Sequence, residues 1–467
     1  KLKDDDEDSI LKLKVKFLPK DKITDLKRWL INFSEEFDIN SKIHLSAKYN
    51  RVSDVNYFKD IARTNTDIKS LKSNLKLTYD DKENFLSTSL LTENEQIVNS
   101  GTPVYVRQLE GSISKTINAT SNTPIQADLV STKFTHDTPA KESGIRSHGK
   151  LSISRSLNIN YPNITPNANV NLTNYSLKNS PNINRIILGA GVDVDFTFIQ
   201  NKSLFNKEVT HRISPKISYS YRAKKIQGDI PIFDSTDKYD DIITFSDLTS
   251  GERYTGLDRI TNANDITLSL ESSYRDIESL SDDKDLLNMK IAQTFYTDDE
   301  VVSDTTNTNY EARKSYSDIA ASISLAVGKY AFKSEAQYNP DKAKIIKKEN
   351  SVSYVSSNRK FITYSYSDAE TKKTEKIFGA YPLTNKIHLF GGYDRAISTG
   401  ITNSETGGIA YESCCWAFRV AHFKESRGSD QYNYSTAFEL VLSGLGSTSA
   451  PLKNRVENKI PGYKANL

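Results

Sequence analysis

The two cysteines of this 467-residue chain are adjacent, at Cys414 and Cys415 in the stretch Tyr411-Glu-Ser-Cys-Cys-Trp416. Thiols at these positions can stay reduced and pack as small apolar side chains. They can also bond to each other in a strained disulfide between neighbours. Alternatively, each can pair with a cysteine on a segment outside this sequence, which requires an oxidising compartment. The choice among these depends on the class of protein that carries them.

No other set of side chains indicates catalysis or a metal site. The stretch Gly144–Lys150 matches the first seven positions of a phosphate-binding loop, but Leu151 stands where a Ser or Thr must hold magnesium. A nucleophile-elbow sequence is also lacking. The histidines are not spaced as paired metal ligands, and they stand at His44, His136, His148, His211, His388 and His422. We therefore predict a protein that is not an enzyme and that needs neither metal nor cofactor.

The composition favours strands and loops over helices. The chain contains 25 Tyr and 19 Phe but one Met and two Trp. Its 62 basic residues are balanced by 59 acidic ones, for a net charge of +3, which argues against nucleic acid as a partner. No stretch approaches the roughly 18 consecutive apolar residues of a membrane helix. Because the sequence begins at Lys1 without a leader, we interpret it as a truncated or processed product.

Apolar and polar residues alternate with a period of two along much of the chain, which is typical of β-strands with two different faces. Each run is short, and the signal lies in their repetition. The clearest runs are Ile43–Asn50, Leu151–Leu157, Val192–Phe198, Ile217–Tyr221, Ile266–Leu270, Ile323–Val327 and Phe438–Leu442.

The connections between these runs alternate between short and long. Ala326–Tyr330 and Pro382–Lys386 are tight, whereas Gln227–Asn264 and Asp298–Ser317 are long and polar. Short turns alternating with long loops are typical of an outer-membrane barrel. A soluble sandwich or propeller is also all-β, but about 20 strands without a domain boundary would be unusual for a soluble sheet. We predict an all-β fold, a large antiparallel up-and-down transmembrane β-barrel of about 20 or more strands.

Several stretches together resemble one family. They are Thr249–Asn264 in the longest loop, Tyr411–Val420 around the cysteines, Phe438–Leu445 with Ile460–Tyr463 near the end, and Val52–Phe58 near the start. They resemble the LptD family of lipopolysaccharide-assembly outer-membrane proteins, and the resemblance spans nearly the whole chain. It implies a location in the outer membrane of a Gram-negative bacterium.

The resemblance also implies a domain organisation. In the family a periplasmic jelly-roll domain precedes a very large barrel, and this sequence contains no such domain. Residues 1–445 are then the outer-membrane β-barrel, truncated at its N-terminal side, and residues 446–467 are a C-terminal periplasmic tail.

For the cysteines, the local pattern and the resemblance make separate predictions. Alternation stops at Tyr411 and resumes at Trp416, which predicts a tight turn over Glu412–Cys415, where both thiols can face the same way. The resemblance implies that Cys414 and Cys415 each bond to a cysteine of the N-terminal region and clamp the periplasmic domain beneath the barrel. Without those partners, the two thiols are expected to be free or artificially linked.

The function implied by the resemblance is insertion of lipopolysaccharide into the outer leaflet of the outer membrane. Acyl chains pass through a lateral gate between the first and last strands, and sugars pass through a polar lumen that Asp193 and Asp195 could line. The expected C-terminal side of the gate is the strand Phe438–Leu445, for which an ordinary closing strand is the alternative. Its core residues are Phe438, Glu439, Leu440, Val441 and Leu442.

The implied partners are lipopolysaccharide, membrane lipid, a plug lipoprotein LptE within the lumen, and a periplasmic bridge protein LptA that contacts the absent N-terminal domain. The longest loop is the candidate for plug contact, and a loop packed against its own lumen wall is the alternative. The candidate contact residues are Gly251, Tyr254, Gly256, Leu257, Asp258 and Arg259.

Three other classes compete with this interpretation. A general outer-membrane porin or receptor barrel shares the architecture but not the Cys-Cys turn. A secreted β-rich adhesin would be soluble without detergent. A barrel hydrolase would need a catalytic constellation, which the sequence does not offer.

Overall fold

The computed structural model describes residues 11–58, 60, 68–99, 101–120, 122–157, 161–205, 207–277, 285–298, 315–369, 372–426, 431–443, 446–447 and 452–465. Over these ranges the chain forms one sheet of 24 strands, accompanied by two short α-helices. The fold is all-β, as the alternation predicts. Neither described helix has the length and apolarity of a membrane span.

The strands follow one another along the chain, with connections that range from two residues to the 40 residues 223–262. Their bounds are β1 Lys12–Leu18, β2 Arg28–Asn40, β3 Ile43–Val52, β4 Ser70–Asp81, β5 Leu86–Ile97, β6 Val106–Thr120, β7 Thr123–Thr135, β8 Gly144–Ser154, β9 Asn163–Leu177, β10 Ile183–Asp195, β11 Phe198–Leu204, β12 Lys207–Arg222, β13 Ala263–Asp276, β14 Asp285–Tyr296, β15 Ile319–Val327, β16 Tyr330–Asn339, β17 Lys344–Ser357, β18 Lys360–Ala369, β19 Lys372–Pro382, β20 Ile387–Ala396, β21 Ile401–Glu412, β22 Trp416–Ser426, β23 Tyr432–Leu442 and β24 Gly446–Ser447. The helices are α1 Phe245–Ser250 and α2 Leu452–Lys459, and a 3-10 turn, η2, covers Lys238–Asp240.

The strands pair with their neighbours in sequence, and every described pairing is antiparallel. One departure occurs at β12, which pairs with β10 along Lys216–Arg222 and with β11 along Lys207–Ile213. The interruption between β10 and β11 lies beside Pro215, which has no N–H to donate to a ladder. β10 and β11 therefore act as one long strand with a break.

The two faces of the sheet differ in chemistry. Along β13, Ile266, Leu268 and Leu270 are exposed on one face, while Thr267 is buried on the other. Along β10, Ile186 is exposed and its neighbour Arg185 is buried. An exposed apolar face opposite a polar inner face is the reverse of a soluble sandwich and is typical of a transmembrane barrel.

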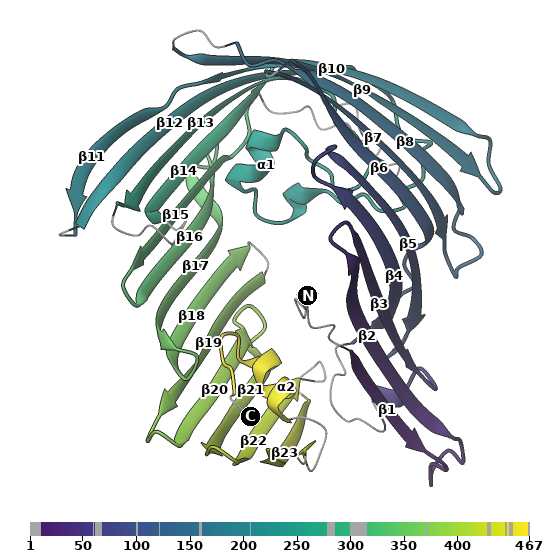
Figure 1. The fold of residues 1–467 in the computed structure, drawn as a ribbon, viewed down its shortest axis with the longest axis vertical. Coiled ribbons are helices and arrows are strands. Elements are labelled where there is room, and N and C mark those ends of the chain that lie inside the picture. Colours follow the sequence, from purple (N-terminus) through teal and green to yellow (C-terminus); the bar gives the residue numbers. More distant parts are fainter. Residues whose placement is uncertain are drawn as a thin grey trace, which may run out of the picture.

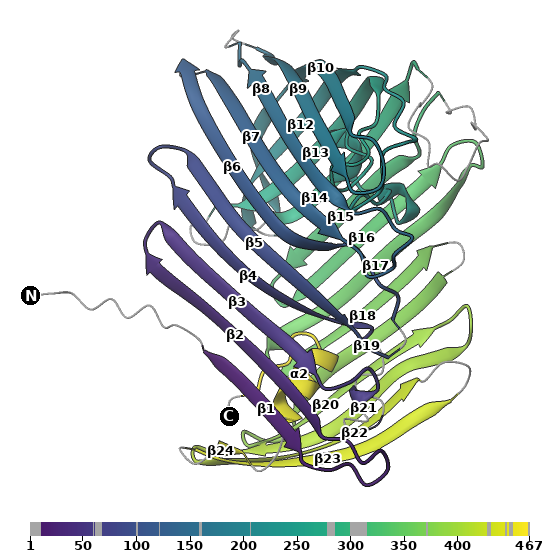
Figure 2. The same cartoon turned by 90° about the vertical axis from the view of Figure 1, so that its right-hand side faces the viewer.

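The sheet is curved, with its polar face inside. Figure 1 shows an arch in which β10 and β12 lie at the top and β1 and β23 stand at the feet of opposite sides. Figure 2 shows the strands of both walls tilted, with β2–β7 running from upper left to lower right and β15–β19 of the other wall running from lower left to upper right. In the described part of the chain, no pairing joins β1 to β23 or β24, so the sheet is not closed.

The two rims of the arch have different connections. One rim carries short turns, among them residues 41–42, 328–329 and 358–359. The opposite rim carries the longest connection, residues 223–262 between β12 and β13. The turn with Cys414 and Cys415, between β21 and β22, belongs to the short-turn rim, because the strands alternate in direction. Short turns on one side and long loops on the other are the expected arrangement of an outer-membrane barrel.

Candidate functional site

The cysteine turn is compact and open to solvent. It consists of residues 413–415, and Glu412 still pairs with Ala417 in the ladder, so the predicted turn over Glu412–Cys415 is one residue too long at its start. Both thiols are free and exposed, with their Sγ atoms 2.8 Å apart. The backbone N–H of Ser413 donates to the carbonyl of Trp416 at 2.9 Å, which closes the turn.

The closeness of the two sulfur atoms changes their acidity. A hydrogen bond with the Sγ of Cys414 raises the pKa of the Cys415 thiol, and the charge that Cys414 can carry adds to the effect. Both thiols face the same side of the turn and are accessible, so each could bond to a separate cysteine of another segment.

A buried network of charged side chains lies directly behind this turn. Arg419 donates to Glu412 at 2.9 Å and to Glu439 at 2.9 Å, and all three side chains are almost fully buried. Arg359 makes a further ion pair with Glu412. Buried charges are tolerated when they are paired and hydrogen-bonded. The network therefore joins β22 to the end of β21, next to the cysteine turn, on one side and to β23 on the other.

The predicted gate residues occupy β23, with side chains on alternate faces. Phe438 is 67% exposed on the outer face, whereas Glu439 is 1% exposed on the inner face. On one side, β23 pairs with β22 along its whole length, and on the other β24 pairs with Val441 and Leu442. Leu440 is half-buried, and residues 444–445 of the predicted strand lie outside the described residues. β23 is thus the last long strand on the C-terminal side of the opening.

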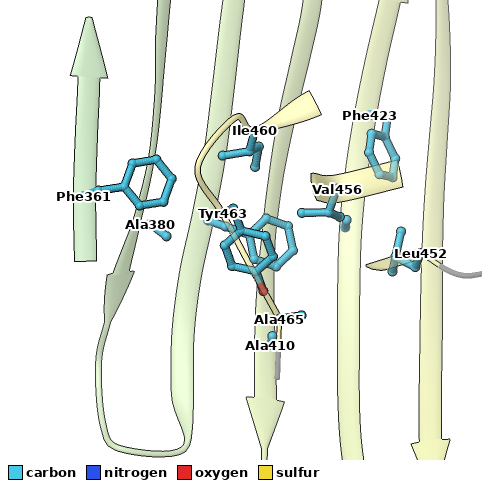
Figure 3. Packing of buried hydrophobic residues seen from close by; sticks show 11 residues of the cluster. Phe361, Ala380, Ala410, Phe423, Leu452, Val456, Ile460, Tyr463 and Ala465 are labelled. Carbon is cyan, nitrogen blue, oxygen red and sulfur yellow. The ribbon is translucent and has the colours of Figure 1, made fainter. Parts of the chain in front are cut away.

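The described part of the tail, for which a periplasmic location is expected, is packed against the inner face of the sheet. Leu452, Val456, Ile460 and Tyr463 are buried against side chains of β18 to β22. Figure 3 shows them lying over these strands. The Tyr463 hydroxyl lies 2.6 Å from Nε2 of His388 on β20. The compartment of this segment stays a prediction.

At the opposite rim, the longest loop is anchored by a buried carboxylate. Asp258 is fully buried, and its Oδ1 lies 2.8 Å from Nη1 of Arg146 and accepts from the Tyr175 hydroxyl at 3.2 Å. Its Oδ2 accepts the backbone N–H groups of Phe233 and Asp234 at 2.7 and 2.8 Å. One side chain thus joins two parts of the loop to β8 and β9.

Two further arginines complete this anchor. Arg185 of β10 donates to the carbonyls of Leu257 and Asp258 at 2.6 and 2.8 Å. Arg259, which is also buried, donates to the carbonyls of Ile230 and Asp258 at 2.9 and 3.2 Å. The side chains of Asp258 and Arg259 are therefore engaged within the chain.

The two loop carboxyls differ in acidity. Burial opposes ionisation of Asp234, but the hydrogen bonds and charge of Arg146 outweigh it, so the pKa of Asp234 is lowered. Burial, together with the nearby charge of Asp234, raises the pKa of Asp258, although the positive charge of Arg146 acts to lower it. Arg146 therefore holds one carboxyl that ionises readily and one that ionises less readily.

The same loop extends across the inside of the arch to the other wall. Leu248 of α1 packs with Ile243, Ala292 and Ala320, which places α1 against β14 and β15. The N–H of Ile243 donates to Gln337 of β16 at 3.0 Å. The loop thus forms a strap between β8–β10 and β14–β16, and Figure 1 shows α1 inside the arch.

Two glycines of the strap have backbone conformations that favour glycine. Gly251, which ends α1, has φ +65°, and Gly256 has φ +64°. A Cβ on Gly256 would stand 2.4 Å from Oδ1 of Asp234. Gly251 and Gly256 are exposed, and Tyr254 and Leu257 are half-buried. These four residues are therefore part of the accessible surface of the strap.

Asp193 and Asp195 lie on the inner side of β10. Their side chains are on the same face of the strand as that of Arg185, and the side chain of Ile186 is on the other face. Lys216 of β12 lies 3.1 Å from Asp193 and 3.9 Å from Asp195. Both carboxylates are half-buried and share one cation. That they line a lumen stays a prediction.

Sequence reasoning missed the arginines that organise both clusters. Arg146 and Arg419 stand at polar positions of alternating runs, which indicates an inward side chain but gives no partner. A buried arginine needs a carboxylate, and that need is the one signal that could have linked them to Asp258 and Glu439. Over the described ranges, no three His, Cys, Asp or Glu side chains converge to hold a metal ion.

A family model described as "LptD: LPS transport system D" matches residues 27–394. This chain belongs to the LptD family. It is 22% identical over 477 residues to the LPS-assembly protein LptD of Pseudoalteromonas atlantica, an alignment that covers 96% of this chain and 61% of the relative. It is 25% identical over 467 residues to the LPS-assembly protein LptD of Aromatoleum aromaticum, with 96% and 57% covered. This LptD-family chain therefore spans about three fifths of the length of these relatives.

The solved structures that match the LptD-family chain are more distant. A ferric enterobactin receptor of Pseudomonas aeruginosa is 8% identical, with a TM-score of 0.33, and 92% of this chain and 72% of the receptor are covered. The copper transporter OprC is 8% identical with a TM-score of 0.25, and 92% and 71% are covered.

Proposed function

We propose that this chain is the barrel part of an outer-membrane translocon that inserts lipopolysaccharide into the outer leaflet of a Gram-negative outer membrane. The observation that carries the proposal is the LptD family match over residues 27–394. The relatives described above are named LPS-assembly proteins. The activity is passage along a path, with no covalent bond made or broken.

The two faces of the sheet suit such a passage. Exposed apolar side chains such as Leu268 suit contact with lipid. Polar inner side chains, among them Asp193 and Asp195, suit contact with hydrated sugars. A lateral gate needs one weak seam in an otherwise hydrogen-bonded sheet. Phe438–Leu442 of β23 is our candidate for the C-terminal side of that seam.

The cysteine turn gives the proposal a covalent component. We infer that Cys414 and Cys415 each bond to a cysteine of a preceding segment in the longer protein, in an oxidising periplasm. Their accessibility on the short-turn rim supports this. In that assembly, LptA would hand lipopolysaccharide to the domain that the disulfides clamp.

The strap is our candidate for contact with the plug lipoprotein LptE. Gly251, Tyr254, Gly256 and Leu257 are the residues best placed to touch it, because the side chains of Asp258 and Arg259 are buried. Asp258 and Arg259 would then support the contact by shaping the strap. Substitution of Tyr254 by Ala is expected to reduce co-purification of LptE, and unchanged recovery would count against contact.

The test of function uses the full-length protein in a Gram-negative cell depleted of its own LPS-assembly protein. Expression is expected to restore arrival of newly made lipopolysaccharide in the outer leaflet, measured by labelling intact cells. Cys414→Ser/Cys415→Ser is expected to reduce that arrival, and mass spectrometry of the unreduced wild type should show both cysteines bonded to upstream ones. No restoration, with the protein present and folded in the outer membrane, would reject the function.

A further inference from the structure

The helix that follows the last long strand is attached to that strand from inside. The backbone N–H of Lys453, in the first turn of α2, donates to Oε2 of Glu439 at 3.1 Å. Nη2 of Arg455 donates to the Ser435 hydroxyl at 3.1 Å. Ser435 and Glu439 are four residues apart on the inner face of β23, so α2 is bonded to this strand at two points along its length.

α2 is in turn fixed to the wall of the arch. Val456 and Ile460 belong to a buried cluster with Phe361 of β18 and Phe390 of β20. The cluster also includes residues of β19, β21 and β22, so the helix and the segment after it rest on five consecutive strands (Figure 3). Ala437 of β23 also packs against this cluster, but its buried members outside the tail all come from β18–β22, so most of the apolar surface that seats α2 belongs to the wall.

Charged side chains reinforce the attachment. Arg455 lies over the ring of Phe423 on β22, 3.6 Å from its centroid, and Lys459 pairs with Glu425 at 3.1 Å. Glu439 also pairs with Arg419 of β22. Movement of β23 away from the wall would therefore separate buried charges as well as break a ladder, and an unpaired buried charge is costly.

We propose that α2 is an internal brace that fixes β23 to the wall formed by β18–β22, so that β23 is the stationary edge of the seam. Opening of the seam then comes from movement of the strands that face β23, and Glu439 is the positioning residue that joins edge and brace. This inference rests on the proposed function, because it gives the two edges of the gate different roles.

The first experiment measures how firmly β23 is attached to α2, and it does not depend on lipopolysaccharide transport. Hydrogen exchange of the amides of Tyr432–Leu442 is followed in the purified full-length protein in detergent. Ser435→Ala/Arg455→Ala is expected to speed exchange in β23 about tenfold, since local opening becomes easier. Lys459→Ala removes a contact of α2 with β22 alone and is expected to leave exchange in β23 unchanged. Equal exchange in the double variant and the wild type would overturn the brace.

The second experiment restores the attachment chemically. In Ser435→Cys/Arg455→Cys, a short bis-maleimide joins the two new thiols and ties α2 to β23. Lipopolysaccharide delivery by the tethered protein is expected to match the wild-type rate, because a stationary edge does not need to leave α2. Before tethering, delivery is expected to fall. Delivery that stops on tethering would mean that β23 moves away from α2 and would overturn the proposal.

Two controls keep the outcomes separate. Ser435→Cys treated with a monofunctional maleimide reports the effect of modification without a tether. Should the double cysteine variant fail to fold, Ser435→Ala alone is measured by hydrogen exchange, with the same expected direction. A wild-type protein that delivers no lipopolysaccharide would reject the proposed function, and the exchange experiment would still decide whether α2 braces β23.

Discussion

Arg419 and Glu439 are register partners on β22 and β23, and Nη1 of Arg419 lies 2.9 Å from Oε2 of Glu439 with neither side chain reaching solvent. The same guanidinium group donates to Glu412, next to the cysteine turn. One arginine thus connects the edge strand with the turn where covalent attachment is proposed. Removal of Arg419 leaves the buried Glu439 without this cation, and removal of Glu439 leaves the buried Arg419 with Glu412 but one carboxylate fewer.

We expect Arg419→Ala and Glu439→Ala each to lower the stability of the barrel by about 3–5 kcal/mol, as for other broken buried pairs. Arg419→Met/Glu439→Leu removes both charges and is expected to cost less than either single change. Heat-modifiable mobility in electrophoresis measures the loss. A double variant less stable than both single ones would show that the pair itself, and not the unpaired charge, dominates.

Gly256→Ala is expected to loosen the strap. The substitution forces a side chain into a left-handed conformation, which costs about 1–2 kcal/mol, and places its Cβ against Asp234. Limited proteolysis within residues 223–262 should become faster. Gly328→Ala is the control, because Gly328 has a similar φ of +58° but an added Cβ would meet no atom within 4 Å. A similar loss of stability in the two variants would show that backbone strain alone, without the contact with Asp234, explains the effect of Gly256→Ala.

Asp258→Asn is expected to destabilise the strap by about 2–3 kcal/mol, because Arg146 loses a charged partner in a buried site. Asp195→Asn, which weakens a half-exposed ion pair with Lys216, is expected to cost about 1 kcal/mol or less. Hydrogen exchange of the Phe233 and Asp234 amides, which donate to Asp258, reports the change directly. Exchange that is equally slow in the wild type and Asp258→Asn would contradict the role of this carboxylate.

Alkylation of Cys415 in the reduced protein is expected to need a higher pH than an ordinary thiol with a pKa of about 8.5. The thiolate is the reactive form, and the neighbouring Cys414 raises the pKa of Cys415, so at a given pH less thiolate is present. Cys414→Ala removes this neighbour and should shift the alkylation profile to lower pH. Mass spectrometry of the peptide after timed iodoacetamide treatment measures the rate.

The strands were the part of the fold that sequence could predict. Ile43–Asn50, Ile266–Leu270 and Ile323–Val327 all fall within strands of the sheet, because alternation depends on neighbouring residues alone. The short turn at residues 328–329 was also predicted for the same reason. No local pattern marks the open junction between β1 and β23, since pairing between distant strands depends on residues far apart, and a gate between the first and last strands is expected from the family resemblance alone.

The polar clusters inside the arch were beyond prediction for a related reason. Arg146 and Asp258 are 112 residues apart in sequence, and nothing in either segment specifies the other. The polar composition predicts a long loop over Gln227–Asn264, and the connection in the structure covers residues 223–262. Its path across the arch depends on which inward side chains it meets. Likewise, the tail after β23 gave no sign that Val456 and Ile460 would pack against β18–β22.

The position of α2 also bears on the order of folding. Its seat consists of side chains from β18 to β22, which all precede it in the chain, so the helix can dock only after those strands have come together. Until then, Phe361, Phe390 and Phe423 form an uncovered apolar patch, which is the kind of surface that chaperones bind and that aggregates. Docking of α2 covers that patch, so this step removes the apolar surface that an assembly intermediate exposes on the inner side of β18–β22.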